Sequence, residues 1–343
     1  MRAVYLTGHG GNEVVQVGQR PEAEPQAGEV LVRLHAATLN HVDLYMRDSG
    51  AGITHNLPEI MGLDGCGVVE RVGPGTASLA AGTPAVVHPG IACGHCEFCI
   101  RGDTALCASI RFLGEHRDGT FAEYVCLPAK NVFAKPAPLS DAEAAALGTT
   151  YLTAWRMLFT KAQLKPWETL LIFGIGGGVS LAALQFAKRL GVRVIVTSRH
   201  DAKLARAAEL GADAAINSSR EDVARKVMAL TGKRGVDVVL ENVGQVTWPS
   251  ALRALCKGGR LVVCGATTGD APSAELRRLF VRQIAIFGSS LGSLDEFRQM
   301  LTYVERTGIK PVIGARYPMD EIHAALDYLA SSQQFGKVAL EIG

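Results

Sequence analysis

The sequence has no run of eighteen apolar residues, and its first ten residues, MRAVYLTGHG, contain no long apolar core. From these two absences we expect the protein to have neither a membrane span nor a signal peptide. The net charge is only +2, which argues against a dedicated nucleic-acid binder. Hydrophobic residues make up 48% of the chain and charged residues 20%, so nothing indicates disorder or a fibre. We therefore expect a globular cytoplasmic protein that acts on a small molecule.

The length of 343 residues exceeds one ordinary hydrophobic core and predicts two domains. In the first 130 residues, short β-prone runs alternate with glycine and proline, as at 29–37, 67–72 and 119–127. This pattern favours a compact, barrel-like β unit.

The character of the sequence changes near Ser140, where an alanine-rich stretch follows a serine suited to an N-cap and predicts a helix. Beyond it, apolar strands and amphipathic helices alternate, which implies a parallel sheet with helices on both faces, and hence an α/β fold. The predicted strands are 169–173, 193–197, 236–240, 260–264 and 283–289, and the predicted helices are 180–190, 202–210, 248–256 and 319–330.

Four cysteines follow the spacing C-x2-C-x2-C-x7-C, and they are Cys93, Cys96, Cys99 and Cys107. Four thiolates at this spacing can close a tetrahedral shell around one structural zinc ion. Two alternatives are a pair of disulfides, with three possible pairings, and an iron–sulfur cluster. The usual bacterial cluster run has a shorter last spacing followed by proline, whereas Ala108 follows here, so we favour zinc. The other cysteines are expected to be buried free thiols, and they are Cys66, Cys126, Cys256 and Cys264.

The segment GIGGGVS, residues 174–180, lies between a predicted strand and a predicted helix. Glycines there allow a sharp turn and a close approach to a pyrophosphate at the helix N-terminus. The spacing departs from G-x-G-x-x-G, because Ser180 takes the place of the third glycine. We predict a dinucleotide site, and the alternative is a glycine-rich turn without a ligand. The cofactor-binding residues predicted in this loop are Gly174, Gly176, Gly177, Gly178 and Val179.

The end of the next strand reads VTSRHDAK and bears on the choice of coenzyme. An acid there would bind the ribose hydroxyl of NAD, but the chain has Ser198, followed by Arg199 and Lys203. Basic residues accommodate the extra phosphate of NADP, so we predict NADPH rather than NADH. One alternative is that these basic residues are only the solvated start of a helix. The other is that Asp201 is the ribose-binding acid, displaced along the chain.

With these motifs in this order, the chain resembles the medium-chain dehydrogenase/reductase superfamily over its whole length. Within it, the chain looks most like bacterial zinc-type alcohol dehydrogenases or quinone oxidoreductases. The resemblance implies a GroES-like catalytic domain of residues 1–148 and 289–343, a Rossmann domain of residues 149–288, and an active site in the cleft between them. The segments that carry it, besides the cysteine and glycine loops, are NHVDLYMRDSG (40–50), PEIMGLDGCGVVERVG (58–73), GEHRDGTFAEY (114–124) and the closing GKVAL.

Zinc alcohol dehydrogenases of this superfamily carry a second, catalytic zinc on Cys, His, and Cys or Asp. The matching positions here hold Asn40 and Leu63, and the third falls near Thr149. Losing all three ligands removes the binding shell, so the resemblance implies no catalytic zinc. Two alternatives remain for His41: a different metal site with Asp43 or Asp64, or a buried, hydrogen-bonded histidine beside a structural acid.

Without a Lewis acid, alcohol oxidation is difficult, whereas reduction of a quinone or an α,β-unsaturated carbonyl compound needs only hydride, hydrogen bonds to an enolate and a proton. The quinone oxidoreductase branch suggests Asn40 as an amide partner of nicotinamide or substrate and Tyr45 as a proton donor. Tyr45 can instead be a pocket wall, with water as the acid. The rival functions are a zinc-dependent alcohol dehydrogenase and a non-catalytic NADPH-binding protein.

The resemblance also implies further cofactor contacts, and a homodimer or homotetramer paired through 283–289. It implies that Lys337 contacts the pyrophosphate of the coenzyme. The alternative is that Lys337 is a surface lysine without a function. The remaining implied contacts are Thr153, Asn242, Gly244, Gly265, Ala266, Gly288 and Ser289.

Overall fold

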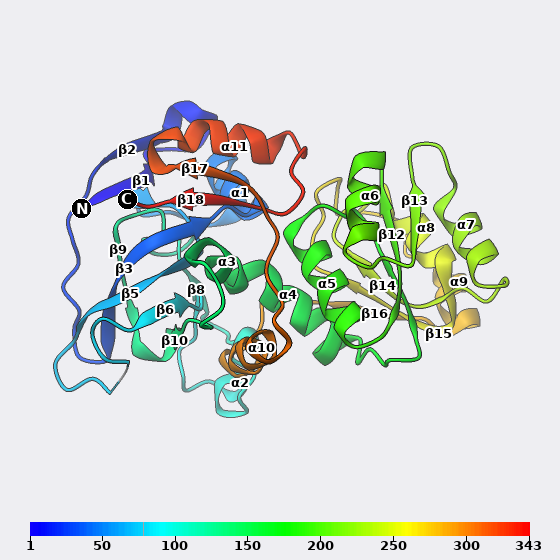
Figure 1. Ribbon diagram of the computed structural model, residues 1–343, viewed down its shortest axis with the longest axis horizontal. Coiled ribbons are helices and arrows are strands. Elements are labelled where there is room, and N and C mark those ends of the chain that lie inside the picture. Colours follow the sequence, from blue (N-terminus) through cyan, green and yellow to red (C-terminus); the bar gives the residue numbers. More distant parts are fainter. Residues whose placement is uncertain (78) are drawn as a thin grey trace. The chain divides into compact units, whose positions relative to one another are not determined.

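The computed structural model describes residues 1–77 and 79–343 and divides them into two compact units (Figure 1). Unit 1 comprises Met1–Leu152 and Leu291–Gly343, and unit 2 comprises Thr153–Ser290. Both boundaries fall a few residues later in the chain than the sequence predicts. In the described part, no helix has the length and apolarity needed to cross a membrane.

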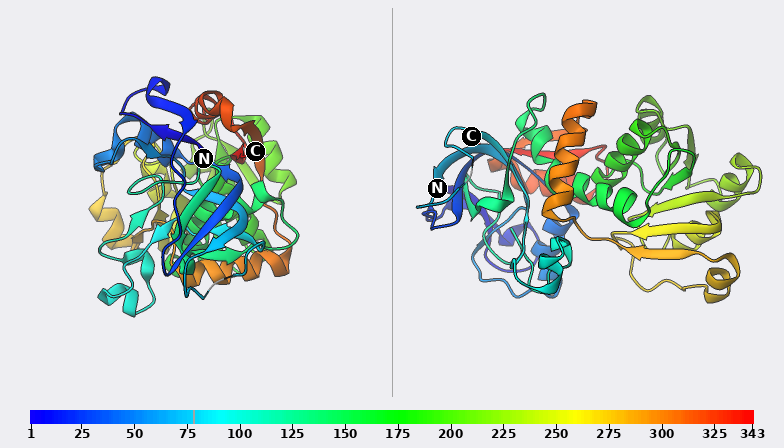
Figure 2. Two further views of the ribbon diagram at one scale, coloured as in Figure 1. Left: turned by 90° about the vertical axis from the view of Figure 1, so that its left-hand side faces the viewer. Right: turned by 90° about the horizontal axis from the view of Figure 1, so that it is seen from below.

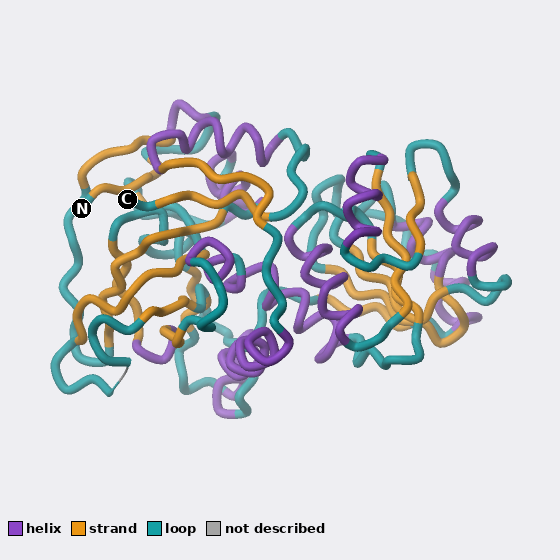
Figure 3. Tube along the Cα trace, in the orientation of Figure 1, coloured by secondary structure: helices purple, strands orange, loops and turns teal. Residues whose placement is uncertain are grey.

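Unit 1 is built on mainly antiparallel sheets, in which β17 and β18 form a parallel pair. The main sheet has the order β10-β6-β5-β3-β18-β17, with β9 also paired to β3, and a second sheet has the order β2-β1-β4. Strand β18 comes from the end of the chain yet pairs with β3, with Ala339 opposite Thr38 (Figure 3). The strands are β1 (Arg2–Leu6), β2 (Val15–Gln19), β3 (Glu29–Thr38), β4 (Glu59–Ile60), β5 (Asp64–Val72), β6 (Pro84–Val87), β7 (Gly90–Ile91), β8 (Arg111–Phe112), β9 (Tyr124–Pro128), β10 (Val132–Ala134), β17 (Ile313–Pro318) and β18 (Lys337–Glu341).

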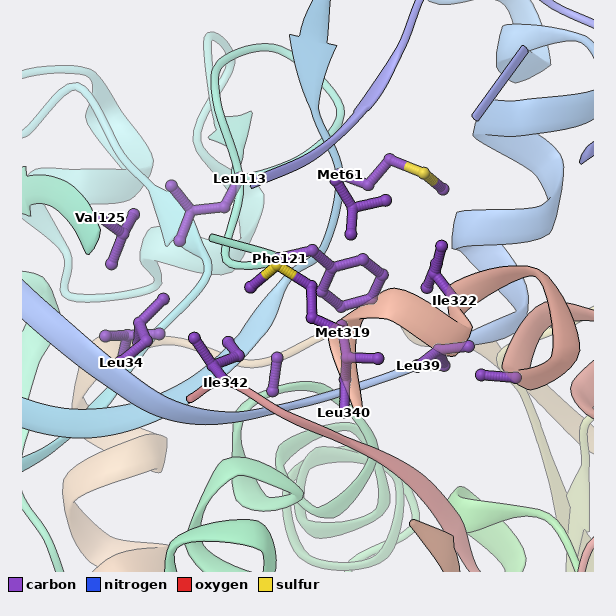
Figure 4. Close-up of a cluster of buried hydrophobic side chains, with 14 of the residues drawn as sticks. Leu34, Leu39, Met61, Leu113, Phe121, Val125, Met319, Ile322, Leu340 and Ile342 are labelled. Carbon is purple, nitrogen blue, oxygen red and sulfur yellow. The ribbon is translucent and has the colours of Figure 1, made fainter. Parts of the chain in front are cut away.

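The core of unit 1 is formed by buried side chains of these strands and of neighbouring helices and loops, and in it Phe121 packs among Met61, Met319 and Ile322 (Figure 4). Phe121 was expected in a strand, but its backbone N–H donates to Met61 O in a loop, and the strand begins only at Tyr124. The helices of this unit are α1 (His41–Asp48), α2 (Glu97–Ile100), α3 (Asp141–Ala145), α10 (Leu294–Thr307) and α11 (Ile322–Ala330).

Helix α3 begins as predicted, because Ser140 caps it through a reciprocal pair of hydrogen bonds with Glu143. It continues into a π-helical turn, Leu147–Tyr151, and then into α4 (Leu152–Trp155) and a second π-helical turn, Arg156–Lys161. The first of these turns carries Gly148 and Thr149 into the interior of unit 1.

Unit 2 is a six-stranded parallel sheet with the order β13-β12-β11-β14-β15-β16 (Figure 2). The strand order reverses between β11 and β14, and right-handed crossovers therefore place the helices of the two halves on opposite faces. The predicted helix 248–256 ends at Ala254, where β15 takes over. The elements are β11 (Thr169–Ile172), α5 (Gly178–Arg189), β12 (Arg193–Ser198), α6 (Asp201–Glu209), β13 (Ala214–Asn217), α7 (Val223–Leu230), β14 (Val236–Glu241), α8 (Trp248–Ala254), β15 (Leu255–Val263), α9 (Leu276–Arg282) and β16 (Ala285–Gly288).

Candidate functional site

Asp64 stands at the start of β5 and is completely buried in unit 1. Its Oδ2 accepts hydrogen bonds from Thr38 Oγ1 at 2.7 Å and from Asn40 Nδ2 at 2.9 Å. Its Oδ1 accepts one from Thr149 Oγ1 at 2.5 Å. Gly148 must be glycine for this contact, because a Cβ there would lie 2.7 Å from Asp64 Oδ1. The π-helical turn therefore brings Thr149 onto the carboxylate.

Lys337 supplies the positive charge at this carboxylate. It is 3% exposed, and its Nζ lies 3.1 Å from Asp64 Oδ2 and 2.5 Å from Asn40 Oδ1. Lys337 is therefore buried and not a surface lysine, while its predicted reach to the pyrophosphate stays a prediction. A buried ion pair persists only when further hydrogen bonds satisfy both partners. Here Thr38 and Thr149 donate to Asp64, and the Lys337 ammonium donates to Asn40 Oδ1. We name Thr38, Asn40, Asp64, Thr149 and Lys337 the Asp64 cluster.

The side-chain amide of Asn40 forms all its hydrogen bonds within this cluster. Its Nδ2 donates to Asp64 Oδ2 and to Thr38 O at 3.3 Å, while its Oδ1 accepts from Lys337. Both amide hydrogens are therefore taken by the protein. This differs from the expectation of an amide partner for nicotinamide or substrate, and it makes Asn40 a residue that positions Lys337 and Asp64.

Other ionisable side chains surround the cluster. Burial raises the pKa of Asp43 to about 8, against the lowering effect of the Asn40 N–H, which donates to Asp43 Oδ2 at 2.6 Å. Burial also raises the pKa of Glu115 to about 7. The pKa of His41 is lowered, first by burial and then by the Lys337 ammonium. Burial thus favours the protonated forms of Asp43 and Glu115 near neutral pH, although the Lys337 ammonium lowers the pKa of Asp43.

Asp43→Asn should remove a pH dependence of stability. Because the pKa of Asp43 is higher in the folded than in the unfolded chain, its contribution is full below about pH 4 and is lost as the pH rises towards 8. We expect the unfolding free energy of the wild type, minus that of the variant, to fall by about 1.4 kcal/mol per pH unit between about pH 5 and 8. Urea unfolding at four pH values measures this difference, and parallel pH profiles would contradict the assignment.

The four cysteines meet as predicted. The Sγ atoms of Cys93, Cys96, Cys99 and Cys107 all lie within 4.8 Å of one another. Among the described residues, this is the one set of three or more His, Cys, Asp or Glu side chains gathered like a metal shell. Backbone N–H groups lower the pKa of Cys93 to about 5, which favours the thiolate that a metal requires. The donor set therefore fits one closed metal site.

All eight cysteines are free thiols, which differs from the disulfide alternative. Outside the cluster, Cys66, Cys126 and Cys256 are buried as expected, whereas Cys264 is only partly buried. Its place just beyond the end of β15 leaves it near the edge of the sheet.

In unit 2, the glycine loop follows β11 at the point where the strand order reverses. Gly174 has a φ of +65° and Gly176 a φ of +125°, conformations that favour glycine. Ser180, in place of the third glycine, is fully buried: its hydroxyl donates to Phe173 O at 3.1 Å and accepts from Asn242 Nδ2 at 2.8 Å. The serine thus ties α5 to the strands on either side of the reversal, β11 and β14.

The other predicted cofactor residues of unit 2 gather at the carboxyl edge of the same sheet. Gly265 and Ala266 follow β15, and Ser289 follows β16 with a hydroxyl oxygen that is shielded from solvent and has no partner in the described part. This orphan hydroxyl and the glycine loop fit a nucleotide cofactor. Thr153 is buried at the start of the unit.

At the end of β12, Ser198 is buried and accepts from the His200 N–H, while Arg199 is exposed. The pKa of Lys203 is lowered by burial and by Arg199. Asp201, the displaced acid, is paired with Arg220 at 2.8 Å and also binds Asn217. That acid is therefore already occupied by protein partners.

The comparisons with known proteins agree with this geometry. Residues 26–137 match the alcohol dehydrogenase GroES-like domain, and residues 178–306 match the zinc-binding dehydrogenase family. A zinc-type alcohol dehydrogenase-like protein of Schizosaccharomyces pombe is 35% identical, covering 92% of this chain and 91% of its own length. This chain belongs to the medium-chain dehydrogenase/reductase superfamily.

Two further similar proteins carry the names of the two candidate activities. A quinone oxidoreductase of Rattus norvegicus is 29% identical, covering 99% of this chain and 97% of its own. A crystal structure of an NAD-dependent alcohol dehydrogenase superimposes with a TM-score of 0.97, at 41% identity and full coverage of both chains. The chain is therefore an NAD(P)H-dependent medium-chain oxidoreductase.

Sequence reasoning named Lys337 as a cofactor contact but missed its burial and its pairing with Asp64; its place in the apolar closing segment FGKVALEI was the available signal. It also missed a second positioning residue. Glu241 is that residue: it ends the apolar strand β14 and accepts from the Gly244 N–H at 2.7 Å and from Thr247 Oγ1 at 2.6 Å, which fixes the loop after that strand.

Proposed function

We propose that the protein is an NADPH-dependent reductase of quinones or α,β-unsaturated carbonyl compounds, with one structural Zn²⁺ on the four cysteines and no catalytic zinc. The Asp64 cluster carries this proposal. The positions that match the family's zinc ligands offer an amide, a leucine and a hydroxyl, and the nearby carboxylate is held by the Lys337 ammonium. This donor set does not suit zinc, which prefers thiolate, imidazole and carboxylate ligands.

When bound, the coenzyme supplies hydride, and the reduced substrate must then gain a proton. Tyr45, on α1, is 40% exposed, and burial of the rest of its side chain raises its pKa. Its hydroxyl has no hydrogen-bond partner in the described part of the chain, so it is free to contact a substrate. His41 and Asp64 are positioning residues in this proposal. Asp64 holds the Lys337 ammonium, and the charge of that ammonium lowers the pKa of His41.

The second candidate is a zinc-dependent alcohol dehydrogenase, which the names of several relatives favour. An NADPH and NADH oxidation screen against quinones, enones and aldehydes, with zinc counted on the same sample, separates the two. We expect one zinc per chain and NADPH oxidation with quinones or enones. Two zinc ions, with activity lost when one is removed selectively, would overturn the proposal. Tight NADPH binding without turnover would indicate the non-catalytic alternative.

Arg199→Ala should raise the Michaelis constant for NADPH about tenfold or more and change that for NADH less than twofold, because only NADPH offers a phosphate to the guanidinium. Steady-state kinetics with both coenzymes test this, and Arg225→Ala, which removes an exposed arginine from α7, is the matched control. Equal effects of Arg199→Ala on the two coenzymes would refute the assignment of NADPH.

Tyr45→Phe should lower turnover by about a hundredfold if the phenol delivers the proton, with little change in coenzyme affinity. Single-turnover oxidation of NADPH gives the rate. An unchanged rate would assign the proton to water and make Tyr45 a wall of the pocket.

We also propose that two copies pair through β16, which is an edge strand of the unit 2 sheet. The preceding helix α9 exposes Leu276, Phe280 and Val281. Light scattering of the wild type and of Ile286→Pro tests this pairing, and an unchanged oligomer would exclude it.

A further inference from the structure

A concave site lies in unit 2, at the end of the sheet opposite the glycine loop. It is a cavity of about 350 Å³ lined by Lys233, Arg234, Cys256, Lys257 and Arg282. The lysine–arginine pair precedes β14, and Cys256 and Lys257 lie in a bulge near the start of β15. Parallel strands begin at one edge of a sheet and end at the other, so this basic cavity is separate from the cofactor edge.

The walls of the basic cavity are fixed by backbone contacts. A Cβ on Gly235 would lie 2.7 Å from Ala254 O and 2.8 Å from Cys256 N, so the turn before β14 presses directly on the bulge. Arg282, at the end of α9, donates from Nη2 to Leu255 O at 2.8 Å. Three separate segments thus present their basic side chains in a defined arrangement.

The charges of the basic cavity are not balanced within the protein. Arg234 pairs with Asp237, its Nη1 lying 3.0 Å from Oδ2. Lys233, Lys257 and Arg282 have no carboxylate partner in the described part of the chain. The Nε of Arg282 is also shielded from solvent and has no acceptor there. A chain whose net charge is only +2 therefore concentrates three unpaired cations and one unused donor at a single cavity.

We propose that the basic cavity binds the phosphate group of a small metabolite. A phosphate dianion offers several acceptor oxygens to the planar donors of Arg282 and the point charges of the lysines. The volume lies at the lower end of the range for small-molecule pockets. Because the ligand would bridge the turn, the bulge and α9, binding stabilises the folded unit.

Isothermal titration calorimetry on the wild type, saturated with its nicotinamide coenzyme, tests the proposal with inorganic phosphate and glycerol phosphate as probes. Saturation keeps phosphate from reporting on the cofactor edge, and sodium chloride holds the ionic strength constant. We expect saturable binding of both probes. Tighter binding of the ester would identify a phosphorylated metabolite as the source, and equal or tighter binding of inorganic phosphate would identify the free ion.

Arg282→Gln and Lys257→Gln should each weaken phosphate binding about tenfold. Arg306→Gln, which removes an exposed charge from α10 in unit 1, should leave it unchanged. Lys257 is exposed, so its variant serves even if Arg282→Gln folds poorly. Absence of saturable binding in the wild type, or wild-type affinity in Lys257→Gln and in a folded Arg282→Gln, would overturn the proposal.

Discussion

Lys337→Met should destabilise unit 1 by about 3–5 kcal/mol at neutral pH, because it leaves the Asp64 carboxylate buried without its counter-charge. Asp64 is completely buried and Lys337 is 3% exposed, so solvent cannot replace the ammonium. The remaining donors, Thr38, Asn40 and Thr149, hydrogen-bond the carboxylate but carry no positive charge. Urea unfolding of the variant and the wild type measures the loss.

The pH dependence of this loss separates the ion pair from simple packing. Without Lys337, the charged carboxylate is buried without a counter-charge, and this cost grows as the pH rises and the charged form becomes dominant in the unfolded chain. The loss should therefore be smaller at pH 5 than at pH 8. The double variant Lys337→Met, Asp64→Asn should regain much of the stability, since it buries no charge. A loss of equal size at both pH values, not relieved in the double variant, would contradict the ion-pair account.

A matched surface variant completes the comparison. Lys226→Met removes a lysine that pairs with Glu221 at 2.8 Å on the surface of unit 2. Exposed pairs contribute about 0–1 kcal/mol, so this variant should unfold close to the wild type. The two variants make the same substitution, so a difference in their unfolding free energies reports the burial of Lys337.

The second large effect is expected at the four-cysteine loop. Cys96→Ser should abolish binding of one metal ion per chain and lower stability by about 4 kcal/mol or more, the linkage expected when free metal exceeds its dissociation constant a thousandfold. For a unit of this size, the unfolding temperature would fall by roughly 10 °C. Metal analysis and calorimetry on the same samples measure both quantities.

Cys126→Ser is the control, because Cys126 is a buried thiol outside the four-cysteine loop. It should keep its metal. Iron in place of zinc, with the visible absorbance of a cluster, would favour the iron–sulfur alternative, and a full metal complement in Cys96→Ser would exclude the four-thiolate site. Chelation of the wild type should reproduce the destabilisation of Cys96→Ser without any mutation.

Local features of this protein could be predicted from short stretches of sequence. The Ser140 cap, the glycine turn at Gly174 and the gathering of Cys93, Cys96 and Cys99 depend on residues a few positions apart, where backbone geometry alone determines the outcome. The strand–helix alternation of unit 2 depends on periodicity within each segment. The order of its strands then follows a known pattern of parallel sheets.

The Asp64 cluster could not be predicted in this way. Lys337 lies 273 residues from Asp64 along the chain, and only the pairing of β18 with β3 brings its ammonium to the carboxylate. The same packing takes both amide hydrogens of Asn40, which sequence reasoning had left free for a ligand. The exposure of a lysine or an amide is a property of what packs over it, and a motif does not contain that information.

By itself, the sequence determined the superfamily, the two domain folds, the gathering of the four cysteines and the glycine turn after β11, because each rests on neighbouring residues with a characteristic spacing. Only the tertiary structure decided that the positions matching the family's zinc ligands adjoin a buried Asp64–Lys337 ion pair, and that unpaired basic side chains meet at the far end of the unit 2 sheet. Burial and charge pairing arise when distant segments pack together, and they set the chemistry that each side chain can perform.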